Sequence, residues 1–417
     1  MKSSVSLAWL FPLAMCGFAA VSVPYLDLAF TSVTRWLALF ALTLFLLHRG
    51  ALFQALRLGA VPALVLWLGW NVATTLWSEQ PELSLVKSLA MALTAVTFTS
   101  AGLYWARSRP QTPLSYLAPF AVLTLFAALP ERGSLVRNSA GVRLYEGLAS
   151  NPNFLGEIAA ISLTYAFYAA YRAHRRADRV SFAMWLAAAA VLGGLLVVSG
   201  ARAAMFGALP ACLVFAFVMV NRRSLVVLAA SLALLAGAVL VLPQSVTAPL
   251  AKPVESLATK GRADFLFSRA RSWGRSYDKA REGGVIGVGF GVSADADGEF
   301  HLGRLTTGKY TREKSNAQLA MIEETGLAGL ALFAVFLVQV FASLFAGIGR
   351  ESGSARADLL LLAGLLVGLT IHSAFESWWT APGSFEAPVF WASIGVAAGL
   401  VRRPQGLEAG TMLPAPA

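Results

Sequence analysis

The sequence predicts an all-α integral membrane protein, with about twelve transmembrane helices and one long extracytoplasmic loop that contains short helices. Of its 417 residues, 57% are hydrophobic and 13% are charged, and the mean hydropathy is +0.65. This composition is too apolar for a soluble protein of that length. Apolar stretches long enough to cross roughly 30 Å of hydrocarbon recur along the chain, and one polar, basic segment interrupts them.

The apolar stretches of spanning length can be read directly from the sequence. They cover about residues 6–24, 30–48, 58–77, 85–106, 112–130, 153–171, 180–199, 203–220, 224–243, 317–346, 357–376 and 384–401. The first has the length of a signal peptide, with Lys2 as its basic start, but Pro24-Tyr25-Leu26-Asp27 is a poor cleavage site. We therefore expect the first stretch to remain as a span.

These spans divide the chain into four predicted parts. Residues 1–243 hold the first nine transmembrane helices, 244–315 form the extracytoplasmic catalytic loop, and 316–401 hold the last three helices. Residues 402–417 form a disordered cytoplasmic tail. The loop contains twelve Lys and Arg against eight Asp and Glu, so we expect it to act on an anionic, lipid-borne substrate.

The orientation in the membrane follows from the distribution of cations. If the N-terminus is cytoplasmic, the short inner segments hold fifteen Lys and Arg, and the short outer loops hold four. Short loops follow the positive-inside rule, whereas long loops are largely exempt from it. Both termini are therefore predicted to lie in the cytoplasm, and the long basic loop is predicted to lie on the other side of the membrane.

Several kinds of site have no support in the sequence. Cys16 and Cys212 fall inside spans, so no disulfide framework is expected. The sequence contains no Walker loop, no HExxH motif and no CxxC cluster, and we expect no cofactor, no metal ion and no nucleic-acid partner. The run Gly287-Val288-Gly289-Phe290-Gly291 is only a weak dinucleotide motif, because no strand–helix unit frames it.

An arginine-rich stretch in the loop, residues 262–281, reads as a helix. At 100° per residue, Arg269, Trp273 and Tyr277 fall on one face with Arg262 beside them. Aromatic neighbours indicate that Arg269 and Arg262 point inward, where a partly desolvated guanidinium suits a bidentate contact with phosphate. Snorkelling or a structural ion pair with a nearby aspartate is the alternative for both arginines.

Arg202 closes the short outer turn Ser199-Gly200-Ala201-Arg202 between the seventh and eighth spans. The turn is so short that this arginine must lie at or just below the membrane surface. An arginine that faces protein there needs an anionic partner, because its transfer into the membrane is costly. Glu157, Glu323 and a lipid phosphate are the candidates.

Polar residues also mark the starts of the sixth and tenth spans. Ser150-Asn151-Pro152-Asn153 opens the sixth, where Asn151 and Asn153 are candidate substrate ligands, although a helix cap explains the pattern equally well. Lys314-Ser315-Asn316, whose side chains are further candidate substrate ligands, precedes the tenth, and Glu323 and Glu324 follow within two turns. Either carboxylate is a candidate base, or a partner that forms a salt bridge with an arginine such as Arg202.

Histidines are few on the predicted outer side. His372 and Glu376 are four residues apart near the outer end of the eleventh span, so they share a helical face and could shuttle protons. A buried structural histidine is an equally good reading of His372. His301 lies in the long loop.

Together these patterns resemble the O-antigen ligase and polymerase superfamily of bacterial membrane enzymes, over most of the chain. No single motif is specific, but their order and spacing around one long outer loop are characteristic. The matching motifs are Leu76-Trp77-Ser78 with Pro81, Asn151-Pro152-Asn153, the turn ending in Arg202, Arg269 with Trp273, Gly287-x-Gly289-x-Gly291, and Asn316 with Glu324-Thr325-Gly326-Leu327 and Gly329-Leu330.

The resemblance implies a metal-independent glycosyltransferase with a GT-C-like fold in the bacterial inner membrane. Its donor would be an undecaprenyl-diphosphate-linked glycan, and its acceptor a glycan or a lipid among the membrane lipids. Arg202 and Arg269 would grip the donor diphosphate and stabilise the leaving group. Ligases of the family carry a histidine base where this chain has Ser315, so either His301, Glu323, Glu324 or His372 replaces that base, or the protein is a polymerase-like or divergent member.

The sequence therefore predicts transfer of a lipid-linked glycan on the outer face of the cytoplasmic membrane. A transporter or flippase of lipid-linked glycans is the main alternative from another class, but the spans have few polar residues to line a path. A structural membrane subunit is a third reading, and it leaves the clustered outer arginines without a role.

Overall fold

The structure is a computed structural model, and it describes residues 4–26, 32–57, 59–131, 135–137, 143–219, 267–293 and 314–401. Predictions that concern Arg262, His301, the ninth apolar stretch at 224–243 and the tail at 402–417 lie outside these residues. The division of the chain into four parts, including the extent of the long loop, stays a prediction.

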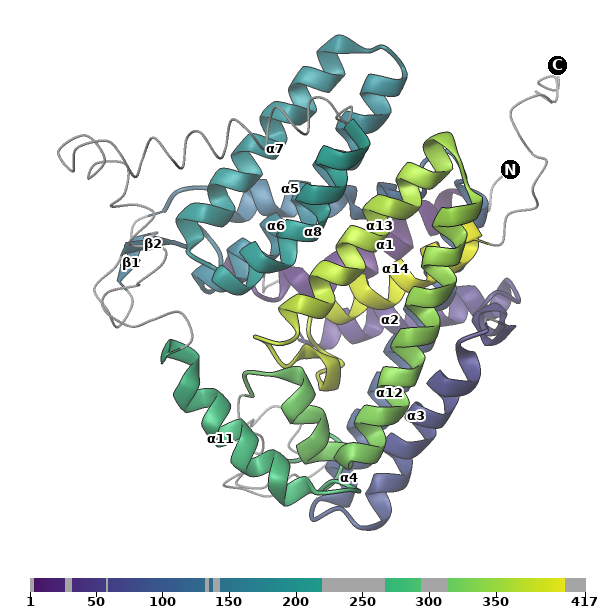
Figure 1. The fold of residues 1–417 in the computed structure, drawn as a ribbon, viewed down its shortest axis with the longest axis vertical. Helices are drawn as coiled ribbons and strands as arrows, with labels where there is room; N and C mark the ends of the chain where they lie inside the picture. Colours follow the sequence, from purple (N-terminus) through teal and green to yellow (C-terminus); the bar gives the residue numbers. More distant parts are fainter. Residues whose placement is uncertain are drawn as a thin grey trace.

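The described residues form a helical protein with a single small hairpin (Figure 1). Strands β1 (Leu135–Arg137) and β2 (Arg143–Tyr145) pair antiparallel, with Val136 opposite Leu144. The helices are α1 (Ser4–Ala20), α2 (Ser32–His48), α3 (Val61–Ala73), α4 (Pro81–Ser108), α5 (Ala118–Ala127), α6 (Pro152–Arg175), α7 (Arg179–Ser199), α8 (Arg202–Met219), α11 (Phe267–Gly283), α12 (Ala317–Arg350), α13 (Gly353–His372) and α14 (Glu386–Val401). Short 3-10 helices add Pro24–Leu26, Leu52–Arg57, Thr74–Leu76, Pro113–Leu117 and Trp378–Thr380.

The prediction of an all-α membrane protein is confirmed in its main features. Among the described residues, six helices are long and apolar enough to cross a membrane, namely α4, α6, α7, α8, α12 and α13. Shorter apolar helices occupy five further stretches that the hydropathy pattern identified, at α1, α2, α3, α5 and α14. The count of twelve spans stays a prediction, since five of these helices are short and the stretch at 224–243 is not described.

Close backbone contacts between helices, made at glycines, hold the bundle together. Gly102 of α4 faces Ala392 O of α14, and Gly395 of α14 faces Thr99 O of α4, so closely that a Cβ at either glycine would overlap the carbonyl. Gly207 of α8 and Gly368 of α13 meet in the same way. Small residues let helix backbones approach within a membrane, where burial of apolar surface supplies little force between helices.

An aromatic core joins α3, α12 and α14. Phe333 of α12 contacts Trp67 of α3, with their ring centroids 4.7 Å apart, and Trp379, at 4.8 Å. Phe336 contacts Trp391 of α14 at 5.6 Å. This core anchors the middle of α12, after the segment that carries Glu323 and Glu324.

Candidate functional site

Helix α12 is broken at Gly326, close to its start. Gly326 has φ 72° and ψ −178°, which is outside the helical region. The break leaves the carbonyls of Glu323 and Glu324 without helical partners, and they accept hydrogen bonds from Val288 N (2.9 Å) and Gly289 N (3.0 Å). On the other side of the break, Leu327 N and Ala328 N donate to backbone carbonyls of the segment 284–285, both at 3.0 Å.

The glycine-rich segment 283–291 therefore fills the break in α12. Gly287, Gly289 and Gly291 have φ values of 80°, 122° and 76°, which favour glycine. A Cβ on Gly287 would overlap the backbone of Glu324 and Thr325, and one on Gly326 would overlap Val285 O. The run 287–291, which resembles a dinucleotide motif, thus forms backbone hydrogen bonds with the broken part of α12. Non-helical backbone at such depth is tolerated where protein satisfies its polar groups.

A buried cluster of charges lies at this break. The Nζ atom of Lys314 is 2.6 Å from Glu324 Oε1 and 3.4 Å from Glu323 Oε2. Glu323 is fully buried, at 0% exposure, and Glu324 and Lys314 are nearly so. Lys314 thus forms ion pairs with both Glu323 and Glu324, a pairing that the sequence analysis did not suggest. Lys314 had been predicted only as a substrate ligand.

Further hydrogen bonds fix the Glu324 carboxylate. Its Oε2 accepts from Gly291 N (2.7 Å), and its Oε1 also accepts from Thr380 Oγ1 (3.0 Å). Lys314 Nζ donates in addition to Val292 O (2.9 Å), and Lys87 Nζ from α4 donates to Gly291 O (2.8 Å). The cluster thereby ties the glycine-rich segment, α4 and the connection 373–385 to the start of α12.

Helix α11 lies across one end of the molecule, the lower end in Figure 1. Trp273 Nε1 donates to Ser315 O (3.3 Å), and the Trp273 ring lies 5.8 Å from the ring of Phe375. Trp273 thus contacts the rest of the protein, whereas Tyr277, placed on the same face by the helical spacing, does not share this contact and is 56% exposed. Arg269 lies one turn before Trp273 in the same helix, and its side chain is outside the described part of the chain.

Arg202 begins α8 directly after a tight turn. Gly200, with φ 64°, caps α7 in the left-handed conformation, and Ser199 Oγ accepts from Ala201 N at 3.3 Å. Phe206, one turn after Arg202 in α8, stacks on Phe375 with ring centroids 6.0 Å apart. Because Phe375 also contacts Trp273, the helices that carry Arg202 and Arg269 meet at this one aromatic ring.

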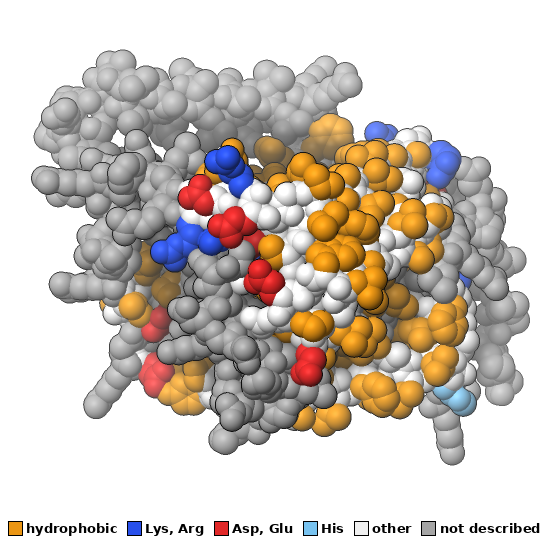
Figure 2. Space-filling view, turned by 90° about the horizontal axis from the view of Figure 1, so that it is seen from below, with side chains coloured by type: hydrophobic (Ala, Val, Ile, Leu, Met, Phe, Trp, Pro, Cys, Tyr) orange, Lys and Arg blue, Asp and Glu red, His pale blue; other side chains and the backbone are white. Residues whose placement is uncertain are grey.

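The surface at the same end combines charged and apolar side chains. Seen from below, side chains of both signs gather in one area of this face, and hydrophobic side chains cover much of the rest (Figure 2). Helix α11 contributes exposed charges at Arg275, Asp278, Arg281 and Glu282. A charged rim beside an apolar face is the character expected where a membrane protein meets lipid headgroups.

The asparagines at the helix starts act as caps. Asn151 Oδ1 accepts from Phe154 N at 2.8 Å at the start of α6, and Asn153 is exposed in its first turn. Asn316 Oδ1 accepts from Leu319 N, and its Nδ2 donates to Ala374 O, both at 2.8 Å. Asn316 therefore also holds the segment after α13 against the start of α12. The cap reading of Asn151 accounts for its contacts.

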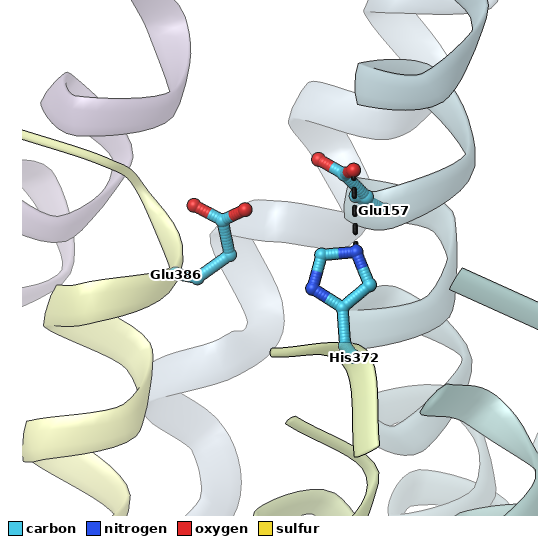
Figure 3. A group of neighbouring side chains, drawn as sticks. All are labelled: Glu157, His372 and Glu386. Atoms are coloured by element: carbon cyan, nitrogen blue, oxygen red, sulfur yellow. Dashed lines mark hydrogen bonds and ion pairs between the residues drawn. The ribbon is translucent and has the colours of Figure 1, made fainter. Parts of the chain in front are cut away.

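A second polar cluster lies between α6, α13 and α14 (Figure 3). His372 Nε2 is 3.2 Å from Glu157 Oε1, and a hydrogen bond joins them. The sequence paired His372 with Glu376 on its own helix, whereas its hydrogen-bond partner comes from α6. Glu386, the first residue of α14, completes the cluster, and one ligand atom from each residue lies within 4.8 Å of the others.

Sequence reasoning missed one member of the second cluster and one pairing in the first. Glu386 was overlooked, although a carboxylate at the edge of an apolar stretch is itself a signal of a functional or paired group. The pairing of Lys314 was missed because only the break at Gly326 turns both following carboxylates toward it. Glu157 was considered only as a partner of Arg202.

The fold and the two clusters define an all-α, multi-pass membrane protein with buried charges at one end and a broken helix beside them. Residues 158–334 match the family model described as O-antigen ligase, a range that covers less than half of the 417 residues. This match supports the resemblance to the O-antigen ligase superfamily that the motifs indicated. No curated protein matches the chain. The matched range includes Arg202, Arg269 and the segment 314–324, but not His372 or Glu386.

Proposed function

We propose that the protein transfers a glycan from a polyprenyl diphosphate to an acceptor at the extracytoplasmic face of the bacterial inner membrane. The observation that carries the proposal is the meeting of the Arg202 and Arg269 helices at Phe375, inside the range that matches the family model. Two arginines on helices that meet at one aromatic ring suit a lipid-linked diphosphate, which combines a doubly charged head with an apolar tail.

In the proposed reaction, an acceptor hydroxyl attacks the anomeric carbon of the donor. A bond forms from the hydroxyl oxygen to that carbon, and the bond from the carbon to the diphosphate oxygen breaks. The hydroxyl proton passes to a base, and the polyprenyl diphosphate leaves with the bonding electrons. Arg202 and Arg269 stabilise the charge that develops on the diphosphate, a contribution that usually dominates such steps.

We assign the Lys314 cluster a positioning role. Glu324 already accepts from Lys314, Gly291 and Thr380, so its carboxylate is committed to fixing the glycine-rich segment. Glu323, His372 and His301 remain the candidate bases, and Arg262, Asn153, Ser315 and Glu376 remain candidate substrate ligands. Ser315 Oγ is buried and has no hydrogen-bond partner among the described residues, so it is available to a sugar or diphosphate oxygen.

Ser315 favours an acceptor different from that of the ligases with histidine at this position. The second candidate function is therefore polymerisation, in which the acceptor is another lipid-linked glycan. The two differ in product: a ligase moves the glycan onto a separate acceptor, whereas a polymerase lengthens the glycan on the polyprenyl lipid.

The test is a transfer assay with purified protein, a defined polyprenyl-diphosphate glycan and both kinds of acceptor. Arg202→Ala and Arg269→Ala should each lower kcat by about a hundredfold or more, and Arg→Lys at either position should recover only part of the rate. Arg179→Ala, which removes an exposed arginine at the opposite end of α7, is the matched control and should keep full activity. Normal rates in both alanine variants at normal yield would refute the assigned roles.

A further inference from the structure

Glu157, His372 and Glu386 lie where α6 meets the two ends of the segment that connects α13 to α14. His372 is the last residue of α13 and Glu386 is the first residue of α14, so the two bracket the connection 373–385. Glu157 reaches them from the second turn of α6. Figure 3 shows the three side chains converging from three separate helices.

The space between them is small and polar at one end. The three residues line a cavity of about 30 Å³ with Gly207, Gly368 and Leu369 among its other walls. A cavity of this size holds one or two water molecules or a single ion. It is too small to enclose a sugar.

The contacts within the cluster are incomplete. His372 is 4% exposed, and its Nε2 bonds to Glu157, but its Nδ1 has no hydrogen-bond partner among the described residues. In Figure 3 that second ring nitrogen lies on the side that faces Glu386. A buried imidazole nitrogen without a partner indicates a bound species between it and the neighbouring carboxylate.

The charges of the cluster also call for a cation. Glu157 and Glu386 are two carboxylates within 4.8 Å of one another, and like charges that close in a buried place repel strongly. A protonated His372 balances only one of them, so the other carboxylate must take up either a proton or a cation. A divalent cation would neutralise both carboxylates and leave the imidazole free to act as a neutral ligand.

We propose that Glu157, His372 and Glu386 form a binding site for a divalent transition-metal ion of the Zn²⁺ or Mn²⁺ type. One imidazole and two carboxylates suit these ions better than Mg²⁺ or Ca²⁺, which prefer oxygen ligands alone. Ligand atoms around a tetrahedral Zn²⁺ at about 2.0 Å lie roughly 3.3 Å apart. One ligand atom from each of the three side chains already lies within 4.8 Å of the others, so small side-chain movements would close the site around an ion that one imidazole nitrogen binds.

The ion would act as a clamp on the connection 373–385. That connection supplies Ala374 O to Asn316, the Ser377 hydroxyl to Lys314 O, and Thr380 Oγ1 to Glu324. Joining its two ends through one ion would therefore stiffen the segment that positions the Lys314 cluster. The ion does not need to touch the glycan donor, so the site is compatible with a transfer reaction that uses no metal, and it does not depend on the proposed function.

The experiment measures metal binding by the full-length protein in detergent. After removal of metal with a chelator, the protein is titrated with Zn²⁺, Mn²⁺ and Mg²⁺, and bound metal is counted by mass spectrometry. We expect one Zn²⁺ or Mn²⁺ per chain, and binding weakened by roughly tenfold or more in Glu386→Gln and His372→Gln, since even residues that only orient a ligand contribute about 10- to 100-fold. Glu282→Gln, an exposed residue of α11, is the control.

A second measurement uses the wild-type protein, so its result does not depend on whether the variants fold. Hydrogen exchange of the wild-type protein should show slower exchange within 373–385 when the metal is added, with no change in α7. The proposal is overturned if stripped wild-type protein takes up no more metal than the Glu386→Gln/His372→Gln double variant. That outcome would mean that Glu157, His372 and Glu386 exchange protons with one another and bind no metal ion.

Discussion

Lys314 shows how a single residue holds the candidate site together. It is buried with two carboxylates, donates to the backbone of Val292, and is followed directly by Ser315 and the cap residue Asn316. Removing water from three charges is costly, and the cost is offset only when each group has close partners. Glu324 meets that condition, with donors from Lys314, Gly291 and Thr380.

The first prediction concerns this lysine. Lys314→Met should destabilise the protein by about 3 to 5 kcal/mol, because it leaves buried carboxylates without their closest cation. The loss is measured as a lower midpoint of SDS-induced unfolding in detergent.

A triple variant separates charge from shape. In Lys314→Met/Glu323→Gln/Glu324→Gln the unpaired charges are gone, so the midpoint should recover most of the loss. If the triple variant is as unstable as the single one, the lysine acts through packing and the electrostatic account is wrong.

At this scale the sequence singled out members of the buried clusters, such as Glu323, Glu324 and His372, but it did not predict their partners. Arg202, Glu323, Glu324 and His372 were identified because polar side chains near the ends of apolar spans are costly and therefore informative. Their partners come from distant positions, as when His372 meets Glu157 across more than 200 residues. Spacing along one helix carries no information about such contacts.

Among the elements, the break in α12 has the largest consequences. It turns a helix of 34 residues into a short first segment, which carries both glutamates, and a long second segment. Broken membrane helices place polar backbone groups and charged side chains at depth, and they commonly line binding sites. Here Trp70 Nε1 also donates to Thr325 O at 2.8 Å, beside the break.

The second prediction tests this element. Gly326→Ala should sharply lower the apparent unfolding temperature, since alanine at φ 72° is strained and its Cβ would overlap Val285 O. The same scan applied to Gly349→Ala provides the control. Gly349 lies near the end of the same helix with open space around it, so alanine there should raise stability by about 0.5 to 1 kcal/mol.

Equal behaviour of the two variants would contradict the account of the break. The sequence analysis did not predict this feature, because 317–346 reads as one apolar span in spite of Glu323 and Glu324, and an isolated glycine is often tolerated in a helix. Only the pairing with the segment 283–291 makes the break stable. That segment lies in the part of the chain that hydropathy reads simply as a loop.

For the whole molecule, hydropathy was the most reliable guide. Eleven of the twelve apolar stretches contain an apolar helix in the described residues, with boundaries that differ by a few residues. Hydropathy predicts helices well because every backbone group in hydrocarbon must be satisfied within the segment. It does not predict which helices touch, since contacts such as that of α4 with α14 depend on glycines far apart in the chain.

The third prediction addresses the orientation of the whole molecule. In a background with Cys16→Ala and Cys212→Ala, the exposed residues Ser150 and Arg176 at the two ends of α6 are each replaced by cysteine. A membrane-impermeant maleimide should label Ser150→Cys in spheroplasts, and should label Arg176→Cys only after permeabilisation. The reverse pattern would invert the topology and move the arginines to the cytoplasm.

The close contact of α4 with α14 has a consequence for how the molecule is made. Helix α14 is synthesised after every other described helix, yet its Gly395 faces a carbonyl of α4, near the beginning of the chain. The surface of α4 around Gly102 therefore stays uncovered in the membrane until α14 has been synthesised and inserted. A premature stop shortly before residue 386 should yield a chain that inserts normally but never assembles, and quality-control proteases would be expected to remove it.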